Sequence, residues 1–357
     1  MLDQLLINLS FLADKPTGHT IYANNLLSGL KGLDPILLTS HSFSDHRCYS
    51  IPDHLTPDRG SKGHRSRLLW TQCELPNIYK KLKAGLLFSP IPEAPLFTKL
   101  RYIVTLHDLI PLRFPRISSP LTPYFKYYVP QVLSQAEHII CDSEATAKDA
   151  VDFFGISIKK IAVIPLAYDA DHFRCLDLPT RNYFLYLGRH DAYKNLQRVI
   201  EAFSKLPDRA SYELWIAGPP DHRYTPILVN QIAKLGLSQQ VKFLSYTPYS
   251  ELPILLNQAI ALVFPSLWEG FGLPILESMA CGTPVITSNL SSMPEVAGEA
   301  ALLVDPYNVD AIADALRQVS SDSTLRTHLR QLSLDRASQF SWAKTADATA
   351  TILNRYL

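Results

Sequence analysis

The chain has 357 residues, which exceeds the size of one ordinary hydrophobic core and suits two domains. Hydrophobic residues make up 47% of the sequence and charged residues 19%, a composition that excludes an intrinsically disordered protein. The formal net charge of +1 excludes a protein whose overall field attracts nucleic acid, so no nucleic-acid partner is expected.

The N-terminus and the cysteines favour a cytoplasmic protein. Residues 1–10 contain an acid and no basic segment, unlike a secretory signal peptide. No apolar run reaches the ~18 residues that a membrane helix needs. The five cysteines form no CxxC pair, which suits a reducing compartment.

Two segments of the first half invite more than one interpretation. Residues 59–83 hold seven Lys or Arg and a single Glu, which predicts either a solvated surface loop or a patch for an anionic acceptor or membrane surface. Residues 111–130 are aromatic, basic and rich in proline, which predicts either a packed irregular connection or a segment that contacts acceptor or lipid. Membrane contact through these segments would place the protein peripherally at the inner face of the membrane.

Short apolar runs alternate with helix-like segments along the whole chain, which predicts an α/β fold of parallel strands covered by helices. A polar, proline-containing stretch at 167–182 separates two halves of similar size, so we expect domains at 1–166 and 183–340, each with its own doubly wound sheet. Two such sheets would face each other across a cleft, with ligands at the carboxyl ends of the strands. The expected strands are 5–9, 36–39, 86–88, 102–106, 138–141, 161–164, 183–187, 212–218, 241–244, 260–264, 284–287 and 301–304.

Two sites in the first half follow expected strands. Gly18 lies after the first strand, where a backbone without a side chain can approach a phosphate or an acceptor closely; an ordinary turn is the alternative. His107 and Asp108 follow the strand at 102–106. His107 is predicted either to hydrogen-bond a sugar hydroxyl or a reacting oxygen, or to form a His–Asp pair that fixes the loop.

The segment 186–203 places two cations next to a helix. The strand ends at Gly188, and Arg189 and Lys194 flank the short loop that follows. Two fixed cations at such a junction suit a pyrophosphate leaving group, because they stabilise the charge that develops as the bond to phosphate breaks. Asp191 between them is predicted to cap the helix. The acids of Asp169-Ala170-Asp171 have the DxD form of a metal site but lie in the join, where capping or solvation is expected, and we predict no metal.

The segment 264–286 has the features of an anion site. Glu269 and the glycine turn from Gly270 to Leu273 follow an apolar strand, and Pro274 suits the first position of a helix that ends near Gly282. Flexible glycines and a helix N-terminus suit a diphosphate. Because Glu269 and Glu277 carry negative charge beside a phosphate site, their natural partners are sugar and ribose hydroxyls.

The motif Glu269-GFGLPIL-Glu277 resembles the signature of glycosyltransferase family 4, whose members are retaining enzymes of the GT-B fold, and residues 283–306 resemble that family too. The resemblance implies that Glu269 contacts the donor sugar and Glu277 the ribose. It implies that the backbone of Gly270, Phe271, Gly272 and Leu273 contacts sugar and diphosphate, that Arg189 and Lys194 bind the diphosphate, and that His107 contacts the donor sugar. Gly18 stands where many relatives have two glycines. The resemblance also implies that the helix at 341–357 returns to the first domain.

The implied reaction is transfer of a hexose from a nucleotide-diphosphate sugar, with no cofactor or metal and with retention at the anomeric carbon. Catalysis would rest on Glu269, His107, Arg189 and Lys194, through positioning and leaving-group stabilisation. Mannose from GDP-mannose is the first choice of donor, and a saccharide or lipid-linked acceptor fits the family.

Other functions stay open on the sequence alone. They are a UDP-sugar-dependent glucosyl- or N-acetylglucosaminyl-type transferase, a non-transferring GT-B enzyme such as a nucleotide-sugar epimerase, and a noncatalytic sugar-nucleotide-binding protein. A nicotinamide-dependent oxidoreductase is disfavoured, because residues 5–30 lack the G-x-G-x-x-G turn.

Overall fold

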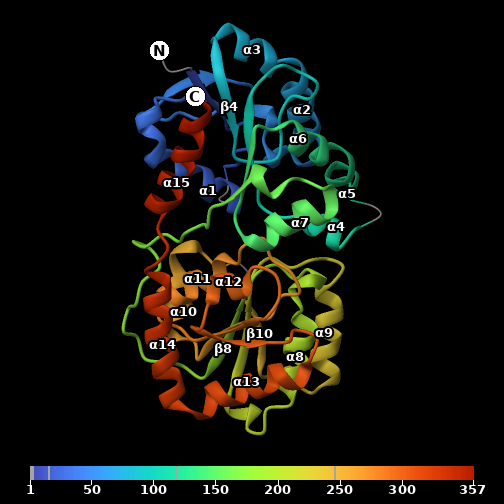
Figure 1. Ribbon diagram of the computed structural model, residues 1–357. Helices are drawn as coiled ribbons and strands as arrows, with labels where there is room; N and C mark the ends of the chain where they lie inside the picture. Colours follow the sequence, from blue (N-terminus) through green and yellow to red (C-terminus); the bar gives the residue numbers. More distant parts are fainter. Residues whose placement is uncertain (1–3, 15–16, 117–118, 245–246) are drawn as a thin grey trace. The chain divides into compact units, whose positions relative to one another are not determined.

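The computed structural model describes residues 4–14, 17–116, 119–244 and 247–357 (Figure 1). The chain forms two compact units. Unit 1 consists of Met1–Leu166 together with Trp342–Leu357, and unit 2 consists of Ala167–Ser341. The stretch expected as an interdomain join therefore belongs to unit 2.

Unit 1 is built on a parallel sheet that has seven strands in its described residues, in the order β3-β2-β1-β4-β5-β6-β7. The central strands are apolar on both faces, as β5 with its fully buried sequence YIVTL illustrates, and this pattern is typical of a parallel sheet covered on both sides. The strands are β1 (Gln4–Asn8), β2 (Ile36–Thr39), β3 (Arg47–Ser50), β4 (Ala84–Ser89), β5 (Tyr102–Leu106), β6 (His138–Cys141) and β7 (Ile161–Val163).

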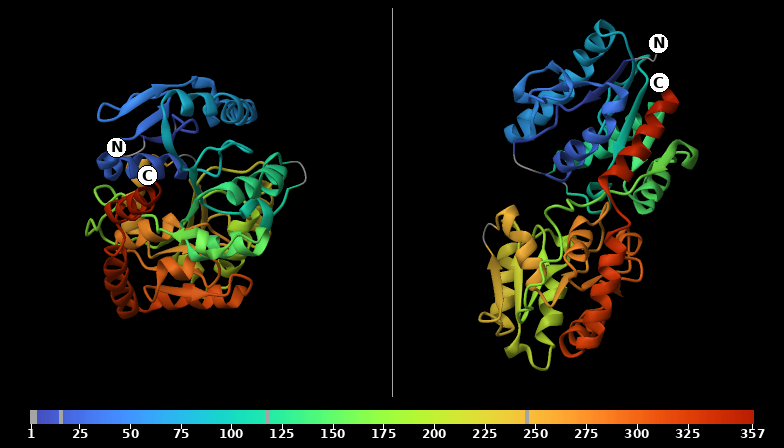
Figure 2. Two further views of the ribbon diagram at one scale, coloured as in Figure 1. Left: turned by 45° about the horizontal axis from the view of Figure 1, so that its top comes forward. Right: turned by 90° about the vertical axis from the view of Figure 1, so that its left-hand side faces the viewer.

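Helices cover both faces of this sheet (Figure 2). Local signals fix their ends; for example, the Ser143 hydroxyl accepts a hydrogen bond from Thr146 N at the start of α7, and Gly155 in the left-handed region (φ 66°) ends it. The helices of unit 1 are α1 (Gly18–Leu30), α2 (Gly60–Cys73), α3 (Leu75–Lys81), α4 (Ile110–Arg113), α5 (Leu121–Pro123), the π-helix η4 (Tyr124–Tyr128), α6 (Val129–Gln135), α7 (Glu144–Phe154) and α15 (Trp342–Tyr356).

The last helix, α15, packs along α1, so the end of the chain completes unit 1 (Figure 1). The two helices approach so closely that a Cβ atom on Gly29 would lie 2.3 Å from the Cβ of Ala346. The half-buried Trp342 lies near Tyr22, with ring centroids 6.4 Å apart, and the Thr345 hydroxyl donates a hydrogen bond to the carbonyl of Pro165.

Unit 2 repeats the design with six parallel strands in its described part, in the order β10-β9-β8-β11-β12-β13. Its strands are β8 (Tyr183–Leu187), β9 (Glu213–Ala217), β10 (Val241–Leu244), β11 (Ala261–Phe264), β12 (Val285–Ser288) and β13 (Ala301–Val304). Its helices are α8 (Leu196–Ser204), α9 (Thr225–Lys234), α10 (Leu252–Gln258), α11 (Leu273–Ala280), α12 (Met293–Ala297), α13 (Val309–Ser321) and α14 (Ser323–Ala337).

Each sheet has one point at which the strand order reverses. In unit 1 the chain builds outward from β1 to β3 and then returns to place β4 on the other side of β1. In unit 2 the chain builds outward from β8 to β10 and then returns to place β11 on the other side of β8. Ligands of open α/β sheets bind at such switch points, beyond the carboxyl ends of the strands. Ligand-binding residues are therefore expected in the loops that follow β1, β4, β8 and β11.

The structure corrects several expectations about segments. Residues 59–83 are not a loop but form mainly α2 and α3, and Arg67 is buried instead of belonging to a basic surface. Residues 111–130 run through α4, α5 and η4 into α6, so the irregular connection is wrong too; residues 117–118 of this stretch lie outside the described residues. Among the helices of the described residues, none combines the length and apolar character that crossing a bilayer requires.

Candidate active site

Two residues predicted to act in the site pair with each other at the switch point of unit 2. Lys194 follows β8 and Glu269 follows β11, and Lys194 Nζ lies 2.6 Å from Oε1 and 2.8 Å from Oε2 of Glu269. Both side chains are largely buried, and the ammonium of Lys194 also lies 5.2 Å from the centroid of the Phe264 ring. A charge-assisted contact of this kind is stronger than one at an exposed surface, because water screens it less.

The loop that carries Glu269 is braced by two serines that follow β12. Ser291 Oγ donates a 2.6 Å hydrogen bond to the carbonyl of Glu269, and Ser292 Oγ donates to the carbonyl of Phe271 at 2.8 Å. Ser291 adopts a positive φ of 58°, which is rare for a residue other than glycine. These bonds hold in place the backbone that presents Glu269.

Asn195, which the sequence reasoning did not single out, ties the two loops of the switch point together. It is buried in the left-handed region (φ 65°), and its Nδ2 donates to the carbonyls of Pro265 at 3.0 Å and Pro306 at 2.7 Å. A further link runs from Leu267 N to the carbonyl of Tyr193 at 2.7 Å. These bonds fix the loop after β8 against the loop after β11, and so fix Lys194 against Glu269.

The glycine turn leads into α11 much as the sequence indicates. Gly272 has a φ of 107°, a left-handed conformation that favours glycine, and a Cβ there would lie 3.1 Å from Ile275 Cδ1. The helix begins at Leu273, one residue before the expected Pro274, ends at Ala280, and is followed by Gly282 with φ 71°. The first turn of α11 therefore presents a helix N-terminus beside Glu269, as an anion site requires.

Glu277 lies on α11 and is partly buried. Among the described residues no side chain forms an ion pair with its carboxylate. Burial raises the pKa of Glu277 to about 7. A carboxyl group in this state gains from a hydrogen-bond donor such as a ribose hydroxyl.

Arg189, which is exposed, forms an ion pair with the buried Asp191 on the same loop. Arg189 is exposed, and its Nε lies 3.3 Å from Asp191 Oδ2, while the buried Asp191 also lies 3.5 Å from Arg223. Asp191 stands at the N-cap position of the short helix at Ala192–Lys194, but its side chain makes no capping hydrogen bond there and pairs with arginines instead. Arg189 therefore stands at the edge of the site, within reach of solvent.

In unit 1, His107 pairs with Asp142 and not with its neighbour Asp108. The register of β5 and β6 sets Leu106 opposite Cys141, so the next residues lie side by side, with His107 Nδ1 2.6 Å from Asp142 Oδ2. Nε2 of His107 lies 2.9 Å from the carbonyl of Pro90, which can only accept. Burial by itself lowers the pKa of His107, but the Asp142 charge outweighs it and leaves that pKa raised. Nε2 therefore donates to Pro90, while Nδ1 shares a proton with the carboxyl of Asp142, whose own pKa burial raises.

Gly18 is the first residue of α1, and Thr17 caps that helix by accepting a hydrogen bond from Thr20 N. Among the described residues outside its own helix backbone and its chain neighbours, a Cβ on Gly18 would meet no atom within 4 Å. Neither backbone conformation nor protein packing therefore accounts for a glycine at this position. Its predicted approach to a ligand stays a prediction.

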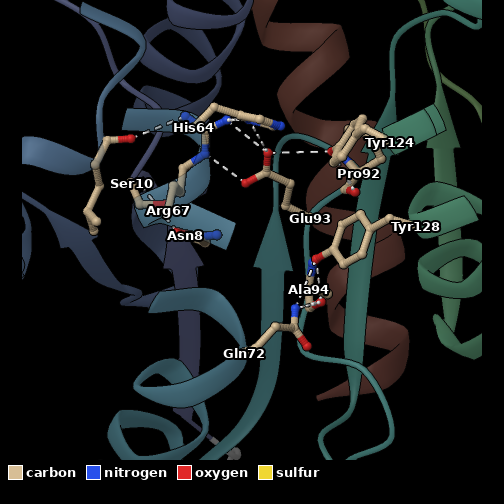
Figure 3. A network of polar contacts seen from close by, with 11 residues as sticks. Asn8, Ser10, His64, Arg67, Gln72, Pro92, Glu93, Ala94, Tyr124 and Tyr128 are labelled. Atoms are coloured by element: carbon tan, nitrogen blue, oxygen red, sulfur yellow. Dashed lines mark hydrogen bonds and ion pairs between the residues drawn. The ribbon is translucent and has the colours of Figure 1, made fainter. Parts of the chain in front are cut away.

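A buried polar network in unit 1 also escaped the sequence reasoning (Figure 3). Arg67 donates two hydrogen bonds to Glu93, from Nε to Oε2 at 2.7 Å and from Nη2 to Oε1 at 2.8 Å. Both side chains are almost fully buried. Tyr124 donates toward Glu93 Oε1 at 3.4 Å or the carbonyl of Pro92 at 3.2 Å, and Arg67 Nη2 lies 2.9 Å from His64 Nδ1. The residues come from α2, from the loop after β4 and from η4. Because these residues lie far apart in the sequence, their pairing cannot be predicted from it.

Elsewhere, the acids of the DxD-like stretch serve a turn. Asp169 Oδ1 accepts hydrogen bonds from Asp171 N and His172 N, both at 3.2 Å. The expected capping role thus describes this carboxylate.

Comparison with known families assigns both units. Residues 16–172 match the model of Glycosyltransferase Family 4, and residues 169–333 match that of Glycosyl transferases group 1. An O-antigen chain mannosyltransferase B of Escherichia coli is 31% identical over 271 residues, which cover 72% of this chain and 70% of the relative. The chain belongs to glycosyltransferase family 4. As a family 4 member it is a glycosyltransferase.

Other relatives of this family 4 chain are similar over part of their length. The O-antigen chain mannosyltransferase RfbU of Salmonella typhimurium is 31% identical over 60% of each chain. The serotype-specific mannosyltransferase WbdA of Escherichia coli is 29% identical over 67% of this chain, but the match covers only 32% of that protein. The chain thus spans about a third of the length of WbdA.

Solved structures share the GT-B fold of the family 4 chain. Sucrose-phosphate synthase from Thermosynechococcus elongatus matches with a TM-score of 0.77 at 19% identity, over 99% of this chain and 98% of that one. Anabaena HepE, solved in complex with UDP and glucose, matches with a TM-score of 0.75 at 17% identity, over 99% of this chain and all of that one. At these identities the likeness establishes the two Rossmann-like units.

Proposed function

We propose that the protein is a retaining, metal-independent mannosyltransferase that moves mannose from GDP-mannose to a saccharide or lipid-linked acceptor. The observation that carries the proposal is the Lys194–Glu269 pair at the switch point of unit 2, beside the N-terminus of α11. The choice of mannose is supported by the relatives at 31% identity, whose names are those of mannosyltransferases.

In this proposal the diphosphate binds at Lys194, Arg189 and the turn from Gly270 to Leu273. The ammonium of Lys194 has three N–H donors, so it can donate to a diphosphate oxygen as well as to Glu269. Glu269 then accepts hydrogen bonds from hydroxyls of the donor sugar, and Glu277 from those of the ribose. Two cations and a helix N-terminus take the charge of the leaving group, which is the work that a metal ion does in other transferases.

Transfer with retention follows from attack on the same face of the sugar that the diphosphate leaves. The leaving phosphate accepts the proton of the attacking hydroxyl, and the new glycosidic bond forms as the bond to phosphate breaks. His107, held by Asp142 and Pro90, contributes an imidazole on a fixed loop at the end of β5 in unit 1. Its predicted contact with the donor sugar requires one N–H to exchange a protein acceptor for a hydroxyl.

The first experiment is a thermal-shift panel with GDP, UDP, ADP and their sugar conjugates, each with and without EDTA. A ligand that binds only the native state raises the melting temperature by mass action. A shift selective for GDP and GDP-mannose, unchanged by EDTA, supports the proposal. A selective shift with UDP-sugars would show that the donor is a UDP-sugar and not GDP-mannose. A shift that EDTA abolishes overturns metal independence, and no shift with any nucleotide overturns the proposed donor site.

The stereochemistry needs a product. Incubation with GDP-mannose and a mannose-terminated acceptor, followed by NMR of the new anomeric proton and carbon, distinguishes the α-linkage expected from retention from the β-linkage of inversion. Release of GDP with an epimerised sugar and no new linkage would instead identify a non-transferring GT-B enzyme.

A further inference from the structure

Unit 1 has its own pocket at its own switch point. The lining residues follow β1, β4 and β5 in the chain, and helix α2 and the π-helix η4 complete the wall. Aromatic and charged side chains and histidine rings line the pocket, among them Phe11, His64, Arg67, Glu93, His107 and Tyr124. This is where an open parallel sheet binds a small ligand, and π-helical turns such as η4 occur often at functional sites.

The size of the pocket limits its ligand. Its volume is about 160 Å³, which corresponds to roughly five water molecules at ~30 Å³ each. This space is comparable in size with one monosaccharide ring. Phe11 and Tyr124 supply aromatic surface, against which the C–H face of a sugar ring packs.

The charges on the wall are balanced. Arg67 is committed to Glu93 by two short bonds, and His107, which also lines the pocket, is committed to Asp142 at 2.6 Å. Desolvation and the adjacent charge of His107 lower the pKa of His19, whose ring lies 4.7 Å from that of His107. Within the described part of the wall, every Arg or His cation thus has a carboxylate partner, so a phosphate would find none uncommitted.

His64 gives the pocket a directed donor. Arg67 Nη2 can only donate, and it lies 2.9 Å from His64 Nδ1, so Nδ1 must be the acceptor. The contact of Nδ1 with Glu93 Oε1, at 3.6 Å, is too long to compete. Burial is the main cause that lowers the pKa of His64, which agrees with a neutral ring. The proton of neutral His64 therefore sits on Nε2, an atom that makes no hydrogen bond to another residue within the described part of the chain.

We propose that this pocket binds one uncharged sugar residue, the terminal unit of a saccharide acceptor, and that the Nε2–H group of His64 donates to one of its hydroxyls. The inference rests on the proposed function and narrows it, because it favours a neutral saccharide end over an acceptor whose reacting unit carries a phosphate. The Arg67–Glu93 pair is a positioning element, since it fixes the tautomer of His64 and takes the place of an anion.

The test compares two probes, methyl α-D-mannopyranoside and mannose 6-phosphate, by ligand-observed NMR titration of the full chain. The neutral sugar is expected to bind in the millimolar range typical of a single small ring, and the phosphate ester at least tenfold more weakly. His64→Ala is expected to weaken the neutral sugar at least fivefold, and His64→Gln, which restores an N–H donor, to recover most of the loss. His54→Ala, an exposed histidine outside the pocket, is the matched control and leaves binding unchanged.

Stronger binding of mannose 6-phosphate than of the neutral sugar overturns the proposal, and so does binding that His64→Ala leaves unaltered. The GDP-dependent thermal shift, measured on the same variants, separates this result from the proposed function. If GDP still shifts the melting temperature and the sugar does not bind, only the acceptor pocket fails. If GDP gives no shift in the wild type, the proposed donor site fails whatever the pocket does.

Discussion

Lys194 holds both carboxylate oxygens of Glu269, at 2.6 and 2.8 Å, across the switch point of unit 2. The two residues were predicted to contact different parts of the donor, yet they contact each other. The pair gives Lys194 a fixed position near the N-terminus of α11 and gives Glu269 a cationic partner. It also makes the two residues energetically dependent, so their substitutions are expected to be non-additive.

Lys194→Ala should weaken GDP binding by about tenfold to a hundredfold, because it removes a cation that contacts the diphosphate and leaves Glu269 to repel it. Guanosine, which lacks the diphosphate, should lose little. Calorimetric titration of both ligands measures the difference. Lys242→Ala is the control, since Lys242 forms a 2.7 Å pair with Glu213 at an exposed site of the same unit. Equal losses for GDP and guanosine would argue against a diphosphate contact.

Glu269→Ala should abolish transfer, with a loss of at least about a hundredfold in kcat, since preorganised groups that act on the reacting sugar contribute on this scale. Glu269→Gln keeps the volume and tests the charge alone. Initial rates of GDP release with acceptor measure the effect, and circular dichroism reports whether the fold is intact. Wild-type turnover in Glu269→Ala would remove this residue from the mechanism.

Glu277 should make stability depend on pH. Burial raises its pKa to about 7 in the folded chain, above its ordinary value of 4.5. The unfolded chain therefore releases the proton first, so the stability that the neutral carboxyl contributes is complete below pH ~4.5 and is lost as the pH rises to ~7. Glu277→Gln, which cannot ionise, should flatten this part of the curve. Urea unfolding at pH 5 and pH 8 measures it, and identical pH dependence in both proteins would contradict the raised pKa.

Glu93→Ala should lower the free energy of unfolding by about 3–5 kcal/mol, because it leaves the Arg67 cation buried without its partner. The double variant with Arg67→Ala should recover part of the loss. Asp152→Ala, which breaks an exposed 2.8 Å pair with Lys148 on α7, is the control and should cost about 0.5 kcal/mol or less. Urea midpoints provide the measurement. A loss as small as that of the control would mean that Arg67 finds water or another partner.

Strands with mostly apolar sequences could be predicted, and those at 36–39, 102–106, 138–141, 183–187, 241–244 and 301–304 have the expected bounds. The strand β3 at Arg47–Ser50 was missed because it lies at the sheet edge with mostly exposed residues, and Arg47 pairs there with Asp34. Its polar sequence carries no hydrophobic period, so pairing with β2 determines the strand instead.

The same distinction applies to the sites. The turn after β11 could be read from the sequence, because glycines, a proline and two glutamates lie within nine residues. The partners of His107 and Arg67 could not, since Asp142 and Glu93 lie 35 and 26 residues away in the sequence. The register of β5 with β6 brings the first pair together, and the docking of α2 on the loop after β4 brings the second.

The packing of α15 on α1 bears on how the chain is made. Unit 1 is interrupted in the chain, because the whole of unit 2 lies between Leu166 and the segment Trp342–Leu357 that completes unit 1. Ala346 of α15 occupies the space that a side chain at position 29 would need. The side of α1 that carries Gly29 is therefore uncovered until α15 has packed on it. Because α15 follows the whole of unit 2 in the chain, unit 2 can fold during translation before α15 is available to unit 1. A chain truncated before residue 342 would leave the apolar side of α1 exposed to aggregation.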